Sequence, residues 1–118
     1  MSSLVLHVGY PKTATTTFQQ HVFPRHPDID YLGKFIPSYG YVDDILGRGF
    51  DDLMHRSSLR YDGGQALASF LDKRLIESSG KCVLVSSESF VHPSAVDLQL
   101  VAERIFKICR SCKIVITI

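Results

Sequence analysis

A short apolar run, Leu4 to Val8, leads directly into the segment Gly9 to Thr17, which reads Gly-Tyr-Pro-Lys-Thr-Ala-Thr-Thr-Thr. The apolar run is typical of a buried strand, and Gly9 and Pro11 favour a turn after it. A helix is expected next, over about residues 14–23. The first amide groups of such a helix have no partner within it, and with the helix dipole they attract an anion. The order of strand, turn and helix therefore predicts a phosphate-binding loop.

The side chains of this loop suit the same purpose. Lys12 adds a full positive charge, and the threonines add hydroxyl donors. The usual nucleotide loop, Gly-x-x-x-x-Gly-Lys-Ser/Thr, has a glycine before its lysine, whereas Pro11 precedes Lys12 in this chain. The order Pro-Lys-Thr-Ala-Thr-Thr instead resembles the 5′-phosphosulfate loop of the sulfotransferases. These enzymes move a sulfuryl group from 3′-phosphoadenosine-5′-phosphosulfate (PAPS) to a hydroxyl or an amine. Most members have glycine where this chain has Ala14, whose side chain hinders close backbone approach to the phosphate.

The resemblance implies which residues surround the 5′-phosphosulfate of PAPS and the matching phosphate of its product, adenosine 3′,5′-bisphosphate (PAP). They are Lys12, Thr13, Ala14, Thr15, Thr16 and Thr17. In the family the lysine also neutralises the charge that builds on the oxygen bridging phosphorus and sulfur, so the resemblance gives Lys12 a catalytic role as well. This chemistry requires no metal ion. The sequence does not identify the acceptor, which is a small molecule or a glycan.

The rest of the chain alternates between short apolar runs and helical spacing, which is typical of an α/β sheet with crossover helices. Strands are expected at Cys82 to Val85 and Lys113 to Ile118, with an extended segment at Ile29 to Lys34. The first helix is expected to end at Pro24, and further helices are expected over Phe50 to His55, over about 67–75 with Gly80 as its cap, and from near Ser94 to Ile108. The predicted fold is a three-layer α/β/α domain with a central parallel sheet. The resemblance implies the P-loop-like fold of the sulfotransferases.

The last predicted strand, Lys113 to Ile118, has a counterpart in the sulfotransferases. There a strand of this kind is followed by an arginine and then a serine, which hold the 3′-phosphate of PAPS. The resemblance therefore covers one incomplete domain over residues 1–118, which corresponds to the N-terminal half of the family fold. An unpaired final strand also leaves self-association into a homo-oligomer open.

Glu88 follows the strand Cys82 to Val85 within the sequence Ser-Ser-Glu-Ser. Ligands of an open parallel sheet gather outside the carboxyl ends of its strands, so Glu88 is expected near the loop that holds Lys12. The acceptor must lose a proton as it attacks sulfur, which makes Glu88 the leading candidate base. The alternative for Glu88 is a structural role, capping a helix or pairing with a lysine. His92 and His55 are alternative bases, although a lone histidine is more often a packing or surface residue.

Composition excludes several classes of function. The net charge of +1 gives no general attraction to nucleic acid or to anionic lipid. The first residues lack the features of a secretory signal, and the apolar runs are too short to span a membrane. An odd number of cysteines, three, argues against a disulfide framework, so a cytoplasmic location is expected.

Two isolated features are expected to be structural. Cys109 and Cys112 form a single Cys-x-x-Cys, a spacing used for zinc or redox chemistry. Because no second pair accompanies them, they are expected to pack as small apolar residues. His7, inside the first strand, is expected to be partly buried with its hydrogen bonds satisfied.

Two alternatives to a sulfotransferase stay open. A P-loop kinase or nucleotide hydrolase requires magnesium and a Gly-Lys-Ser/Thr turn, which this chain lacks. A non-catalytic module would keep a shortened sulfotransferase fold as an interaction surface, and the missing arginine and serine favour it.

Overall fold

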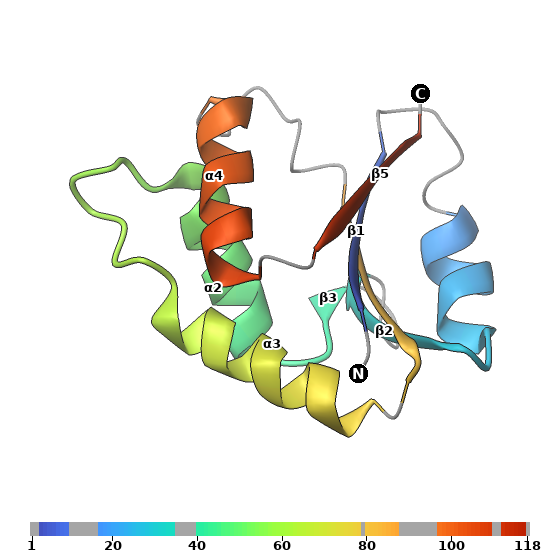
Figure 1. Ribbon diagram of the computed structural model, residues 1–118. Coiled ribbons are helices and arrows are strands. Elements are labelled where there is room, and N and C mark those ends of the chain that lie inside the picture. Colours follow the sequence, from blue (N-terminus) through green and yellow to red (C-terminus); the bar gives the residue numbers. More distant parts are fainter. Residues whose placement is uncertain are drawn as a thin grey trace.

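The computed structural model describes residues 3–9, 17–34, 40–78, 80–87, 97–109 and 112–117. Within these ranges the chain forms a mixed five-stranded sheet with helical segments on both faces, which confirms the α/β class (Figure 1). The elements are β1 (Leu4–Gly9), η1 (Phe18–Val22), η2 (Phe23–Arg25), β2 (Ile29–Lys34), β3 (Gly40–Tyr41), α2 (Asp44–His55), α3 (Gln65–Glu77), β4 (Cys82–Ser87), α4 (Leu98–Ile108) and β5 (Lys113–Thr117).

The strands lie in the order β3-β2-β4-β1-β5. β2, β4, β1 and β5 run parallel, as the sequence predicts, and β3 pairs antiparallel with β2. The prediction of a parallel sheet is therefore wrong at this one edge. The reason is the connection, because residues 35–39 are too few for the crossover that a parallel neighbour requires.

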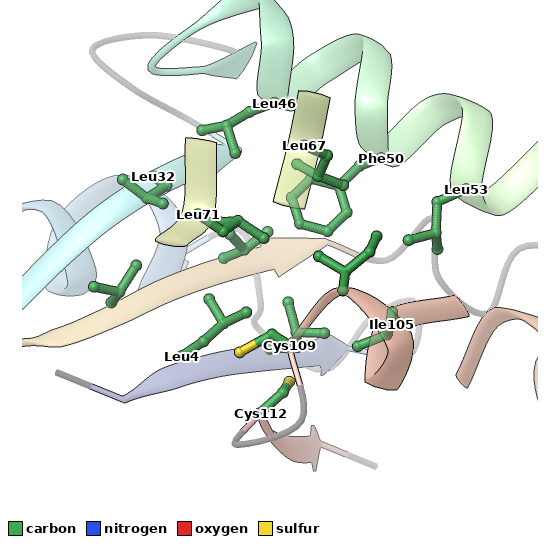
Figure 2. Packing of buried hydrophobic residues seen from close by; sticks show 14 of the residues in the cluster. Leu4, Leu32, Leu46, Phe50, Leu53, Leu67, Leu71, Ile105, Cys109 and Cys112 are labelled. Carbon is green, nitrogen blue, oxygen red and sulfur yellow. The ribbon is translucent and has the colours of Figure 1, made fainter. Parts of the chain in front are cut away.

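The main hydrophobic core lies between the sheet and the helices α2, α3 and α4 (Figure 2). Alternate residues of β1 point to this face, because side chains of a strand alternate between the two sides of a sheet. Those residues are Leu4, Leu6 and Val8, and they pack with buried side chains of the neighbouring strands and helices, including Leu32, Leu46, Phe50, Leu53, Leu67, Leu71, Val83, Val85 and Ile105.

The opposite face of the sheet is covered by η1 and η2, the light-blue helical segment in Figure 1. η1 is one wide turn, in which the Phe23 amide donates to the Phe18 carbonyl. The predicted end of the first helix before Pro24 is confirmed, since η1 ends at Val22 with Phe23 as its C-cap, and the separate 3-10 turn η2 runs from Phe23 to Arg25. Proline fits there because it sits in the first positions of a new turn, where its missing amide proton is not needed.

Three helices differ from their predictions, and α3 ends at Glu77 with Ser78, not Gly80, as its C-cap. α2 begins at Asp44, not near Phe50, and the Asp43 side chain caps it by accepting a 2.7 Å hydrogen bond from the Ile45 amide. α4 begins at Leu98, where Asp97 accepts from the Gln99 amide at 2.7 Å, so Asp97 and not Ser94 is its cap. Ser94 itself lies outside the described residues.

Two arginines tie the helices to their surroundings. Arg74 of α3 donates two hydrogen bonds to the Asp30 carboxylate, at 2.7 and 2.8 Å, and Ser78 Oγ lies 2.5 Å from the same carboxylate. These bonds hold the pKa of Asp30 below its usual value. Arg104 is buried in α4 and donates to the carbonyls of Leu53 and Arg56, at 2.9 and 2.7 Å. Its charge therefore satisfies the carbonyl end of α2.

The cysteines pack as the sequence predicts. Cys109 and Cys112 are buried members of the hydrophobic core (Figure 2). Burial, with Cys109 close by, raises the pKa of the Cys112 thiol to about 12. A thiol that stays protonated is a poor nucleophile and a poor metal ligand, so packing accounts for this pair.

Candidate functional site

The carboxyl edge of the sheet contains a topological switch point between β1 and β4. The connection from β1 to β2 passes over one face through η1 and η2, whereas the connection from β4 to β5 passes over the other face through α4 (Figure 1). Adjacent strands whose connections diverge in this way leave a crevice at their carboxyl ends. This is where ligands of open α/β sheets bind.

The predicted site segments both leave the sheet at this edge. Val8 pairs with Ser87 in the register of β1 and β4, so these parallel strands end side by side. Gly9 pairs with Thr117 on the other side, which places the end of β5 at the same edge. The expectation that the segments after β1 and β4 start next to each other is therefore supported by the strand register.

Most of the predicted site residues belong to the segments after these strands. Lys12, Thr13, Ala14, Thr15, Thr16, Glu88 and His92 lie outside the described residues. Thr17 is described, with an exposed side chain and helical backbone angles that lead directly into η1. His55, the other candidate base, lies in the last turn of α2 and not at the end of a strand.

A buried polar cluster lies near the carboxyl ends of β1 and β4, on the face of the sheet that η1 covers. His7 and Ser86 are direct neighbours in the register of β1 and β4, with His7 Nδ1 2.8 Å from Ser86 Oγ. Gln19, from η1, donates from Nε2 to the same Ser86 oxygen at 2.9 Å. The hydroxyl group of Ser86 thus contacts both another strand and the helix.

All three members of this cluster are almost completely buried. Their relative exposure is 6% for His7, 2% for Gln19 and 0% for Ser86. Burial lowers the pKa of His7 below its usual value, so the ring is neutral near pH 7. Ser86 Oγ accepts a proton from Gln19, and it shares a second hydrogen bond with His7 Nδ1.

The contact between His7 and Ser86 is not a nucleophile with its base. Ser86 Oγ lies within the sheet, and Gln19 of η1 covers it, so a substrate has no route to it. The ring of His7 also packs edge-on against Phe23 of η2, with ring centroids 5.5 Å apart. The prediction that His7 is buried and hydrogen-bonded is confirmed. The sequence did not indicate that Gln19 is buried.

A polar cleft of about 370 Å³ lies at the opposite, amino edge of the sheet. It is lined by Asp30, Arg74, Glu77, Ser78 and Lys81. Arg74 and Ser78 already form hydrogen bonds with Asp30, so these three residues fix α3 to β2. The fold accounts for this cleft without a ligand.

Metal clusters and membrane-spanning helices are both missing from the described residues. Within these ranges no group of three or more His, Cys, Asp or Glu side chains is placed to hold a metal ion. None of the helices in the described part of the chain has the length and apolar character that a membrane crossing requires. The chain matches no family model, no curated protein and no solved structure.

Proposed function

We propose that this chain carries the 5′-phosphosulfate-binding half of a PAPS-dependent sulfotransferase. The observation that supports the proposal most strongly is the switch point between β1 and β4. The segment with the sulfotransferase-like sequence follows β1, and the segment with the candidate base follows β4. In this proposal, the segments that carry the residues of one reaction follow strands that end side by side.

In this proposal the 5′-phosphosulfate is held by Lys12, by the hydroxyls of Thr13, Thr15, Thr16 and Thr17, and by the backbone at Ala14. Thr17 belongs to the described residues, and it is exposed. Lysine and hydroxyl donors are the chemistry that phosphate oxygens prefer. PAPS, when bound, supplies the sulfuryl group.

In the proposed transfer step, Lys12 and the candidate base have separate roles. The acceptor oxygen or nitrogen forms a bond to sulfur, and the bond from sulfur to the bridging phosphate oxygen breaks. Lys12 neutralises the negative charge that remains on that oxygen. Glu88, or His92 in its place, accepts the proton that the acceptor loses. Each proton and charge of the step then has a destination.

Calorimetric titration with PAP tests this proposal. Lys12→Ala removes one charge-assisted bond, worth about 1.5 to 3 kcal/mol, so PAP affinity is expected to fall roughly tenfold to 150-fold. Lys73→Ala is the matched control, because Lys73 carries the same charge but is 77% exposed on α3. It is expected to leave the affinity unchanged. Equal affinities of Lys12→Ala and the unaltered chain would remove Lys12 from the site.

Two further ligand measurements separate the alternatives. If ATP with magnesium binds more tightly than PAP, a P-loop kinase or nucleotide hydrolase is favoured. Turnover of PAPS in the presence of an acceptor would exclude a non-catalytic module. If the 118-residue chain binds PAP but does not turn over PAPS, only the binding part of the proposal stands.

A further inference from the structure

We propose that Ser86 is a positioning residue, which fixes the helical segment after the predicted phosphosulfate loop against the ends of β1 and β4. It does so through its hydrogen bonds to Gln19 and His7. The inference rests on the proposed function. It adds a role for Ser86, Gln19 and His7, which keep the site in its shape.

The three residues of the cluster lie next to the predicted site segments in the sequence. Gln19 lies two residues after Thr17, where the loop residues end, and His7 lies two residues before Gly9, where the loop begins. Ser86 lies two residues before Glu88, the candidate base. One hydroxyl therefore connects three parts of the chain, each within two residues of a predicted site segment.

The hydrogen bond between Gln19 and Ser86 is costly to break because both groups are buried. A fully buried hydroxyl and an amide that is 2% exposed lose their bonds to water, so each depends on the other for its hydrogen bonds. If η1 moved away from the sheet or slid along it, the bond between Gln19 and Ser86 would break. The polar pair therefore permits one placement of η1, whereas apolar contacts alone tolerate sliding.

The apolar side chains of η1 remain largely exposed. Phe18 and Val22 of η1 are 41% and 40% exposed, so much of its apolar surface is not used to hold it. Gln19 is the residue of η1 that is buried. The attachment of η1 to the strands thus includes a buried polar contact, supported by the packing of Phe23 of η2 on His7 and Tyr31.

A loop whose two ends are fixed loses less freedom when it binds an anion, so its affinity is higher. Removing the cluster is expected to loosen η1 and to weaken binding without removing any group that touches the ligand. Ser86→Ala and Gln19→Leu each break the same bond from opposite sides. Because both act on one interaction, their effects are expected to be non-additive in the double variant.

The experiment combines hydrogen exchange with PAP titration, both well below the unfolding temperature. Ser86→Ala and Gln19→Leu are each expected to accelerate exchange of the backbone amides from Gln19 to Phe23 by about tenfold and to weaken PAP binding by about tenfold, the cost of one buried hydrogen bond. Ser78→Ala is the matched control, because Ser78 is also buried and hydrogen-bonded but lies at the amino edge. It should change neither quantity, even where it lowers stability.

Unchanged exchange in Ser86→Ala and Gln19→Leu would overturn the inference, whatever the affinity. Faster exchange with unaltered PAP affinity would overturn the link to the site while leaving the proposed function intact. If the unaltered chain binds no PAP, the proposed function itself fails, and the positioning role with it. Loss of PAP affinity in Ser78→Ala equal to that in Ser86→Ala would reduce the effect to general stability and contradict the proposal.

Discussion

His7 shows how a single residue joins the fold to the candidate site. It lies in a strand that is otherwise apolar, and it is buried at 6% exposure with a hydrogen bond to Ser86. Strand periodicity and its neighbours predicted a buried histidine. The Gln19 contact was not predictable, because its partner lies 67 positions away in the sequence and nothing local marks a glutamine as buried.

The burial of His7 makes stability depend on pH. Its pKa is lowered in the folded chain, so the unfolded chain binds the proton more readily. This contribution to stability is complete above the unfolded value of about 6.5 and is lost as the pH falls toward the folded value. His7→Gln removes the titrating group, so its unfolding free energy should fall less steeply below pH 6.5 than that of the unaltered chain. Denaturant titrations at several pH values measure this, and parallel pH profiles would show that His7 is not responsible.

The strands were easier to predict than the helices. β4 lies between β2 and β1 and is buried on both faces, which produces the continuous apolar run seen in the sequence. α2 was predicted too short because Gly47 and Gly49 disfavour helix, by about 1 kcal/mol each relative to alanine. At Gly49 the reason is tertiary, since a side chain there would start 2.8 Å from Leu67 Cβ of α3. Packing between two helices thus outweighs the local preference.

This pair of glycines gives a matched test of α2. Gly47→Ala places a methyl group 3.6 Å from the Tyr41 ring, an ordinary contact, so helix propensity should stabilise the fold by about 0.5 to 1 kcal/mol. Gly49→Ala collides with Leu67 and should destabilise it by about 1 to 3 kcal/mol. Urea unfolding of both variants measures the two signs. A stabilising Gly49→Ala would mean that α2 and α3 do not pack as described.

At the scale of the whole molecule, strand order determines where a ligand can bind. The sequence predicted that the segments after β1 and β4 lie near each other, and the parallel register of the two strands supports it. It did not predict β3 or the full order of the strands, because these depend on pairings between distant segments. The role of Lys12 and Glu88 stays a prediction, because both lie outside the described residues.

We predict that the carboxyl edge between β1 and β4 binds the 5′-phosphate end of PAP. Chemical-shift mapping of the ¹⁵N-labelled chain during a PAP titration tests it directly. We predict that the amides of Gly9, Thr17 and Ser87 shift together with one dissociation constant, while those of Lys81 and Lys113, at the amino edge, do not. Shifts confined to the amino edge, or no shifts at any PAP concentration up to millimolar, would contradict the claim.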